Sequence, residues 1–254
     1  MHRAERKIKS LIDFLLPNDY FRFQQFRIDQ GDCAQKVSTD ACLLGAAADL
    51  AGATRVLDLG TGTGLLALMA AQRAPAAAIE AIEIDPAAAA QAAANVAASP
   101  WAGRIQVWPL SLADYVATQP GLFSHIICNP PFFRRSLAPP NAARATARHE
   151  GAGSLTFGDI IGFAAGHLKA GGTLTVLLPP PEMQQFEQEA AGGGLPVRAR
   201  LVVRHRPGGR ITRCISTFGR GEVGVRESEL AIQAADGTYS AAFRALLGGF
   251  YLAL

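Results

Sequence analysis

The stretch DLGTGTG, at residues 58 to 64, restricts the fold of this chain more than any other feature of its sequence. It overlaps the end of a short apolar run, VLDL at 56 to 59, and another apolar run follows it at 65 to 73. The three glycines allow positive φ angles and let the backbone approach a ligand closely. The pattern therefore predicts a buried strand, a tight loop and a helix, with a binding site at the loop.

Segments typical of strands and of helices alternate from residue 55 onward. The strand segments span 56–59, 78–84, 105–110, 122–129 and 173–179, and the helix segments span 65–73, 86–98, 155–172 and 181–194. This alternation predicts an α/β fold, a mostly parallel sheet with helices on both faces. Two further strand segments within 196–220, on either side of Pro207-Gly208-Gly209, predict an antiparallel hairpin at the edge of the sheet.

The first part of the chain has a different pattern. Residues 20–28, YFRFQQFRI, alternate between apolar and polar side chains and predict a strand or short hairpin. Residues 36–50 predict a helix that begins near Ser38 to Asp40, since all three residue types there are good N-caps. We therefore expect an N-terminal extension with short strands over 1–35 and one domain over 36–254.

Composition limits the class of protein. The chain has 254 residues, of which 49% are hydrophobic, enough for one large core. A net charge of +3 is compatible with an anionic partner but does not require one. The four cysteines form no CxxC pair and do not stand with histidines at metal-ligand spacing, so we expect reduced thiols in a cytoplasmic protein and no metal. No apolar run is long enough to predict a signal peptide or a membrane span.

An acidic residue completes the pattern of the glycine loop. Glu83 lies at the end of the next strand segment, 19 residues after Gly64. In a doubly wound sheet, such a carboxylate points into the crevice at the strand ends, where it can accept both hydroxyls of a ribose. The glycine spacing is GxGxG rather than GxGxxG, which argues against a dinucleotide pyrophosphate. The alternative is a tight turn followed by a solvated glutamate.

DLGTGTG together with AIEID resembles the S-adenosylmethionine site of class I methyltransferases. The resemblance implies a Rossmann-like fold with a seven-stranded sheet, and S-adenosylmethionine as the cofactor. It places Asp58 near the methionine end of the cofactor and Glu83 on its ribose, with the loop glycines packed underneath, at Gly60, Gly62 and Gly64. The acid that reads the adenine is replaced here by Ser111, with Asp114 three residues later, and either can supply that contact. Asp85 is expected to cap the following helix.

The stretch HIICNPPFF, at 125 to 133, resembles the signature of enzymes that methylate an amino or amide nitrogen in a planar conjugated group. The lone pair of such a nitrogen is delocalised, so two acceptors that bind its hydrogens can direct it at a methyl group. The resemblance assigns these roles to the side-chain oxygen of Asn129, which also lies beside the cofactor, and to the carbonyl of Pro130. Pro131 makes residue 130 extended and fixes that carbonyl in advance. Phe132 is expected to stack on an extruded base, and Phe133 either helps or simply packs.

The alternative for this stretch is an Asn-Pro turn followed by two core phenylalanines. A non-enzymatic protein, such as a cofactor-binding scaffold, would leave Asn-Pro-Pro-Phe without a role.

Segments outside these motifs resemble the bacterial valine-tRNA adenine-N6 methyltransferases, which modify the adenine next to the anticodon. They are residues 24–47, NPPFF at 129–133, ARHE at 147–150 and 236–252. The resemblance implies tRNA as the partner. It places Lys36, Thr39 and Asp40 beside the cofactor, helix capping being the alternative.

The same resemblance assigns RNA contacts to basic residues in two places. Three residues that follow the Asn-Pro-Pro-Phe loop are expected to steer the RNA backbone: Arg144, Arg148 and His149. The alternative is that they belong to a solvated loop without contact to RNA. The arginines of 198–213, among them Arg204 and Arg206, are expected to form a phosphate-binding face. The alternative is a basic edge strand that resists aggregation.

Other methyltransferases fit less well. Protein glutamine methyltransferases share this kind of loop, but they resemble chains with a separate helical domain in front. Ribosomal RNA guanine-N2 methyltransferases commonly carry an extra domain, and DNA adenine methyltransferases need a sizeable target-recognition region. We expect neither a membrane nor a metal partner, and a monomer or weak dimer.

Overall fold

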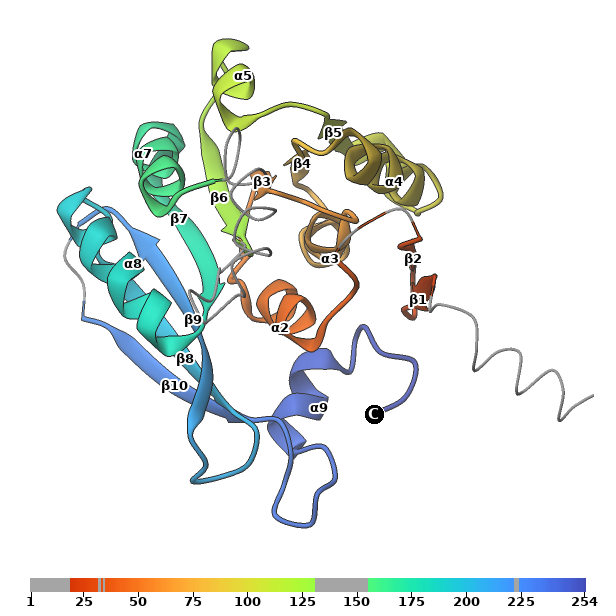
Figure 1. Ribbon diagram of the computed structural model, residues 1–254, viewed down its shortest axis with the longest axis vertical. Helices are drawn as coiled ribbons and strands as arrows, with labels where there is room; N and C mark the ends of the chain where they lie inside the picture. Colours follow the sequence, from red (N-terminus) through yellow and green to blue (C-terminus); the bar gives the residue numbers. More distant parts are fainter. Residues whose placement is uncertain (1–18, 32, 34, 131–154, 222–223) are drawn as a thin grey trace, which may run out of the picture.

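The computed structural model describes residues 19–31, 33, 35–130, 155–221 and 224–254. Its centre is an eight-stranded sheet with the order β10-β8-β9-β7-β6-β3-β4-β5 (Figure 1). The strands of this sheet are β3 (Arg55–Leu59), β4 (Ala78–Ile82), β5 (Ile105–Trp108), β6 (Phe123–Cys128), β7 (Leu168–Leu178), β8 (Val197–Arg204), β9 (Ile211–Gly219) and β10 (Arg226–Ala231). The helices are α2 (Thr39–Ala47), α3 (Leu65–Arg73), α4 (Pro86–Ala97), a 3-10 turn η1 (Ala102–Arg104), α5 (Leu112–Ala117), α7 (Phe157–His167), α8 (Pro180–Gly192) and α9 (Ala241–Leu247).

The strand order places a switch point in the middle of the sheet. From β3 the chain moves outward through β4 to β5, and then returns to the other side of β3 as β6 and continues to β7. These five strands are parallel, so their carboxyl ends share one edge. Ligands of open α/β sheets bind outside the carboxyl ends at such a switch point, here between β3 and β6.

Two hydrophobic cores lie on the two faces of the sheet. Strand residues alternate between them, as the two-residue period of a strand requires: Ile127 joins one core, and Ile126 and Cys128 join the other. The first core contains apolar side chains of α2, α3, α4 and α9, and the second contains those of α5, α7 and α8. Figure 1 shows the two groups of helices on opposite sides of the strands.

The fold class expected from the sequence is confirmed, with three local differences. The sheet has eight strands rather than seven, because Arg226–Ala231 pairs in parallel with β8. The helix expected over 155–172 ends at His167, because Leu168 pairs with Phe123 and so begins β7. The short helices α5 and α9 were not expected from the sequence.

The N-terminal hairpin predicted at 20–28 is present as β1 (Tyr20–Arg22) and β2 (Arg27–Asp29), paired antiparallel. Phe23, between the strands, stacks on Phe26 with ring centroids 4.5 Å apart and forms a bridge with Tyr251 near the chain end. Gln24 donates from its side chain to the carbonyl of Gly248 at 2.8 Å. The hairpin therefore packs on the C-terminal segment, and the division of the chain at residue 35 stays a prediction.

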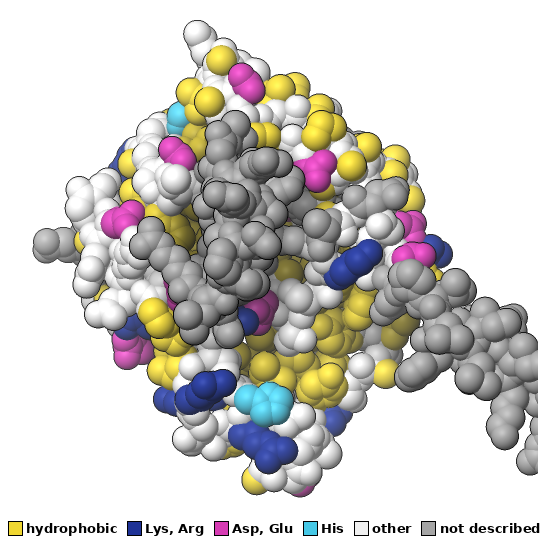
Figure 2. All heavy atoms as spheres, in the orientation of Figure 1, with side chains coloured by type: hydrophobic (Ala, Val, Ile, Leu, Met, Phe, Trp, Pro, Cys, Tyr) yellow, Lys and Arg dark blue, Asp and Glu magenta, His cyan; other side chains and the backbone are white. Residues whose placement is uncertain are grey.

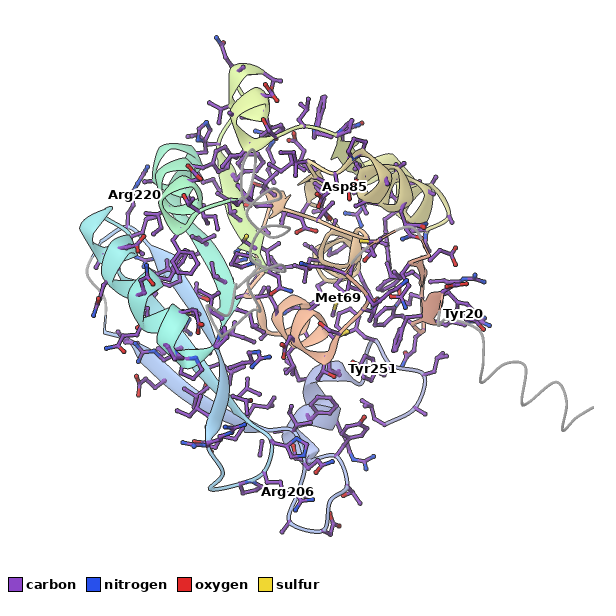
Figure 3. All side chains as sticks on the ribbon, in the orientation of Figure 1. Tyr20, Met69, Asp85, Arg206, Arg220 and Tyr251 are labelled. Carbon is purple, nitrogen blue, oxygen red and sulfur yellow. The ribbon has the colours of Figure 1, made fainter. Side chains whose placement is uncertain are left out.

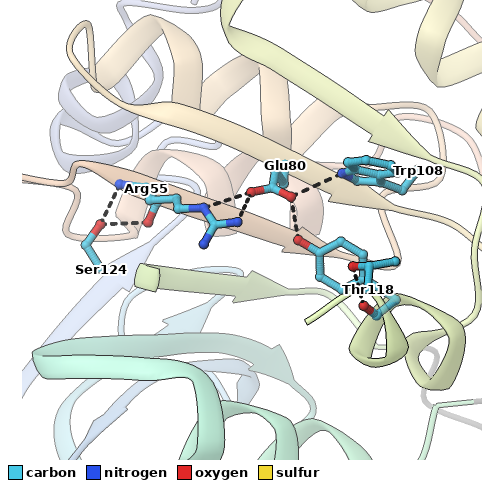
Figure 4. A network of polar contacts seen from close by, with 6 residues as sticks. Arg55, Glu80, Trp108, Thr118 and Ser124 are labelled. Carbon is cyan, nitrogen blue, oxygen red and sulfur yellow. Dashed lines mark hydrogen bonds and ion pairs between the residues drawn. The ribbon is translucent and has the colours of Figure 1, made fainter. Parts of the chain in front are cut away.

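A partly buried carboxylate, Glu80 of β4, links three elements on one side of the sheet (Figure 4). Its Oε1 accepts hydrogen bonds from the guanidinium of Arg55, with Nε at 2.8 Å. Its Oε2 accepts from the indole of Trp108 at 3.1 Å and from the hydroxyl of Tyr115. Burial and the adjacent Glu80 carboxylate raise the pKa of the Tyr115 hydroxyl, which therefore remains a donor. The network ties α5 to the edge strands.

Replacing this carboxylate tests the network. Glu80→Ala leaves three donors without their acceptor, so we expect the free energy of unfolding to fall by about 2–4 kcal/mol, measured by urea titration. The matched control is Glu229→Ala, which removes an ion pair between Arg204 and the 47% exposed side chain of Glu229 and should cost at most about 1 kcal/mol. Equal losses in both variants would contradict the role given to Glu80.

Candidate active site

The glycine loop joins β3 to α3 in the conformation that its sequence predicts. Gly60, Gly62 and Gly64 have φ angles of 76°, 56° and 84°, in the left-handed region that favours glycine. A Cβ on Gly64 would lie 3.4 Å from the side chain of Ala92, so the loop also packs closely on α4. The amides of Gly60 and Thr61 both donate to the carbonyl of Ile82, at 3.0 and 2.9 Å, which fastens the loop to β4.

Asp58 holds the loop from inside the core. It is fully buried, and its Oδ2 accepts from the hydroxyl of Thr61 and, at 3.0 Å, from the amide of Ala67 in the first turn of α3. Its Oδ1 has no hydrogen-bond partner among the described residues. Burial raises the pKa of the Asp58 carboxyl to about 7, against an ordinary value of 3.8. A place beside the methionine end of a cofactor stays a prediction for Asp58, since its contacts are with the loop.

Glu83 holds the loop from the side of the crevice. Its Oε2 accepts from the amide of Gly62 at 2.9 Å, and its Oε1 accepts from the amide of Asp85 at 3.0 Å. Its own amide donates to the carbonyl of Trp108 at 3.1 Å, so β5 fixes its position. Asp85 is the N-cap of α4 and accepts from Ala87, as expected.

A cavity of about 240 Å³ lies at the carboxyl ends of β3, β4 and β6. The described residues that line it are Cys33, Gln35, Leu59, Gly60, Gly62, Ile82, Glu83, Ile84, Asp85, Ala88, Leu110, Leu112, Asn129, Pro130 and Leu155. Carboxylate and backbone groups lie on one part of this wall, and aliphatic side chains on another. Such a mixture suits a nucleoside, whose ribose needs hydrogen bonds and whose base needs apolar contact.

The end of β6 brings Asn129 to this cavity. Cys128, the last strand residue, is buried between Leu59 of β3 and Val176 of β7, so the chain leaves the sheet at its centre. The side-chain oxygen of Asn129 is buried, and it accepts no hydrogen bond from any described residue. Burying an acceptor without a donor is costly, so this atom is a natural site for a ligand hydrogen.

The other predicted cofactor residues are not part of the described cavity wall. Ser111 caps α5 and donates to the carboxylate of Asp114 at 2.6 Å, so the two candidates for adenine recognition bond to each other. Lys36 donates to the carbonyl of Gln30, and Thr39 begins α2 behind the N-cap Ser38. Their cofactor contacts stay predictions.

Sequence reasoning missed several lining residues that neighbour the predicted ones. Ile84, 46% exposed, follows Glu83, and the pair Leu110 and Leu112 flanks Ser111. At the first place the predicted Glu83 and its neighbour Ile84 both line the cavity, whereas at the second the neighbours of Ser111 line it and Ser111 does not. Leu155, near Gly60, belongs to no motif, and only the tertiary structure places it there.

Some predicted substrate residues lie outside the described residues. They are Pro131, Phe132, Phe133, Arg144, Arg148 and His149.

The arginines of the predicted basic face do not share one environment. Three of its arginines form ion pairs: Arg200 with Glu187 at 2.7 Å, Arg204 with Glu229 at 2.9 Å and Arg213 with Asp40 at 2.7 Å. Exposed basic residues remain at the β8–β9 turn, namely His205, Arg206 and Arg210. We call these three residues the basic turn. Figure 2 shows basic side chains together at the lower end of the face in view, where Figure 3 labels Arg206.

The basic turn lies at the same edge of the sheet as the cavity. In β9, which runs antiparallel to β7, Cys214 pairs with Leu178 at the carboxyl end of β7. The turn that precedes β9 therefore extends beyond that edge. Asp40, predicted beside the cofactor, binds Arg213 and so joins α2 to the base of the hairpin.

Among the described residues, no group of three or more His, Cys, Asp and Glu side chains is placed to hold a metal ion. No helix in the described part of the chain has the length and hydropathy to cross a membrane.

The fold and the site define a class I methyltransferase. The model of the methyltransferase small domain family matches residues 33–181. A crystal structure of a predicted O-methyltransferase from Agrobacterium tumefaciens superimposes with a TM-score of 0.64 at 23% identity, covering 83% of this chain and 96% of that one. A ribosomal protein L11 methylase from Lactobacillus delbrueckii superimposes with a TM-score of 0.52 at 20% identity, covering 77% and 84%.

Sequence relatives narrow the class to one family. A tRNA1(Val) (adenine(37)-N6)-methyltransferase from Shewanella amazonensis is 42% identical over 92% of this chain and 99% of its own length. One from Bacteroides thetaiotaomicron is 41% identical over 94% of this chain and 100% of its own length. The chain belongs to the family of the tRNA1(Val) (adenine(37)-N6)-methyltransferases.

The raised pKa of Asp58 predicts a pH dependence of stability. The folded state holds a proton on Asp58 up to about pH 7, whereas the unfolded state loses it near 3.8. The contribution of this group is therefore fully present below about pH 4 and is lost as the pH rises through about 7. Asp58→Asn cannot titrate, so its free energy of unfolding should rise relative to wild type by up to about 4 kcal/mol over this range.

Urea unfolding of both proteins at about pH 5 and about pH 7.5 should measure about 3 kcal/mol of this difference, because pH 5 already lies above the unfolded pKa. A constant difference between the two proteins would show that Asp58 is ionised when folded.

Proposed function

We propose that this protein transfers a methyl group from S-adenosylmethionine to the exocyclic N6 of adenine 37 in a valine tRNA. The observation that carries the proposal is the buried side-chain oxygen of Asn129 in the cavity wall, which has no hydrogen-bond partner among the described residues. The names of the relatives support the substrate. A tRNA substrate also implies a cytoplasmic protein.

The residues of the cavity fit this cofactor. Glu83 has a carboxylate at the end of β4, where two ribose hydroxyls can donate to it. Ile84, Leu110 and Leu112 provide an apolar wall for an adenine ring. The bound cofactor supplies a methyl group that is activated by its positively charged sulfur.

Asn129 and Pro130 orient the amine. One N6 hydrogen is donated to the side-chain oxygen of Asn129 and the other to the carbonyl of Pro130, which draws the lone pair out of the ring. Neither oxygen accepts a hydrogen bond from a described residue, so both are available for the substrate. Because the acceptors are fixed before the substrate arrives, little reorganisation is needed. The nitrogen gains the methyl group and releases one proton, and a strong base is not required.

The tRNA approaches from the carboxyl edge of the sheet. The basic turn lies at that edge, and its arginines, Arg206 and Arg210, have no carboxylate partner among the described residues. Such cations bind backbone phosphates without reading sequence. Arg204 contributes less than predicted, since Glu229 offsets its charge.

Two variants separate the chemical step from cofactor binding. With unmodified tRNA and labelled S-adenosylmethionine, nucleoside analysis should identify N6-methyladenosine. Asn129→Ala should abolish turnover while cofactor affinity, measured by calorimetry, stays near wild type. Glu83→Ala should weaken cofactor affinity by about tenfold or more, since it removes hydrogen bonds to a charged acceptor. Gln106→Ala, at an exposed amide of β5, should change neither measurement. Near-normal turnover in Asn129→Ala would refute the mechanism.

The basic turn makes a separate prediction about tRNA affinity. The double variant Arg206→Gln and Arg210→Gln should weaken tRNA binding and reduce the slope of log Kd against log salt concentration by about 1 to 2. Arg22→Gln, at an exposed position of β1, is the matched control and should leave the slope unchanged. An unchanged slope in the double variant would remove the turn from the RNA interface.

A further inference from the structure

A second groove lies at the opposite edge of the sheet from the candidate active site. Its volume is about 710 Å³, within the range of small-molecule sites. It is bounded by the end of α2, by Leu246 of α9 and by the amino ends of β6, β7, β8 and β10. Neither the proposed reaction nor the basic turn uses any of its residues.

The inner face of the sheet changes character toward this groove. Near the carboxyl edge, Ile127, Leu177 and Ile215 belong to the core beneath α2 and α3. The next residues on this face toward the opposite edge are polar. They are His125, two residues before Ile127 on β6, and Thr217, two residues after Ile215 on β9, and both lie in the groove wall. An inner sheet face is usually apolar, so this polar end is unusual. The hydroxyl of Thr217 lies 3.1 Å from that of Thr175, within the sheet.

His125 is the most buried of these polar residues, with 1% of its surface exposed. Its Nδ1 lies 2.8 Å from the hydroxyl of Thr173, and its Nε2 has no partner among the described residues. Burial lowers the pKa of the imidazole to about 4, so the ring is neutral at physiological pH. When Thr173 donates to Nδ1, Nε2 carries the hydrogen and is a buried donor without an acceptor.

The groove also carries a surplus of positive charge. Lys169, Arg198 and Arg226 line it, and none of the three forms an ion pair within the described residues. Lys169 donates to the hydroxyl of Thr54 at 2.9 Å, and Arg198 donates from Nη2 to the carbonyl of Arg220 at 2.7 Å.

The remaining charges do not cancel this surplus. The Nε of Arg198 is buried without an acceptor. Arg200 of the wall already binds Glu187 and Glu227, which leaves Asp49 as the acidic lining residue without an ion pair in the described structure.

We propose that this groove binds a small phosphorylated molecule, up to the size of a nucleotide. The phosphate lies among the three cations and accepts from the guanidinium of Arg198. The imidazole of His125 and the hydroxyl of Thr217 donate to the neighbouring oxygens, and the apolar residues Leu201 and Leu246 contact the uncharged part. An RNA backbone is a poorer occupant, because the basic turn and the methyl transfer site lie at the other edge.

Direct binding to the full-length protein tests this site. Inorganic pyrophosphate and ribose 5-phosphate are titrated by calorimetry in chloride buffer, with the active-site cavity saturated by S-adenosylhomocysteine. We expect one site per chain with a Kd of about 1 mM or tighter, and no binding of unphosphorylated ribose. Arg198→Gln and Arg226→Gln should each weaken binding by about tenfold. Arg22→Gln should leave it unchanged.

Nuclear magnetic resonance of the imidazole nitrogens provides a measurement that needs no variant. Saturating pyrophosphate should shift the Nε2 resonance of His125. Absence of saturable binding, or equal affinity in the groove variants and wild type, would overturn the proposal. So would a weakened tRNA affinity in those variants without any phosphate binding, since the groove would then be an RNA surface. If an arginine variant does not fold, Lys169→Met, at a partly exposed position of the groove wall, is used in the same binding experiment.

Discussion

The left-handed glycine loop between β3 and α3 is the constraint on which the rest of the site depends, and two carboxylates fix it. Asp58 binds it from the core through Thr61 and Ala67, and Glu83 binds it from the crevice through Gly62. Both carboxylates accept hydrogen bonds from this loop, but their environments differ. Asp58 is buried with a raised pKa, whereas Glu83 faces the cavity, where a ligand can reach it. The loop is therefore rigid before any ligand binds, as a site for a flexible nucleoside cofactor requires.

The strand order converts this rigid loop into a site for chemistry. Because β3 and β6 are adjacent and parallel, the glycine loop and the Asn129-Pro130 turn leave the sheet side by side. One lines the cavity with its glycines, and the other presents oxygens that accept no hydrogen bond from a described residue. The antiparallel strand β9 then carries the basic turn to the same edge. One edge of the sheet thus holds the cavity, the Asn129-Pro130 turn and an exposed positive surface, and the opposite edge holds a separate basic groove.

The residues with specific backbone or chemical requirements were predictable. The glycines were found because positive φ angles leave few alternatives, and Asn129 and Glu83 because each directly ends a strand segment. The cofactor wall was not predictable to the same extent. Ser111 and Asp114 were chosen for their polarity, yet they bond to each other, while their neighbours Leu110 and Leu112 line the cavity. Beyond the end of a strand, the path of the loop decides which side chains face the cavity. The residue types alone do not determine that path.

Taken by itself, the sequence determined the element order, the parallel sheet and the position of the loop, because these follow from local periodicity and from the conformational freedom of glycine. The tertiary structure alone decided the pairing of β10, the early end of α7 and the charge balance of the arginines. Each depends on a partner distant in sequence. The charge of Arg213 is offset by an ion pair with Asp40, and that of Arg200 by an ion pair with Glu187. Arg206 at the turn forms no ion pair with a described residue. Ion pairs and strand pairs form between residues that are close in space. A sequence pattern does not show which distant residues the fold brings together.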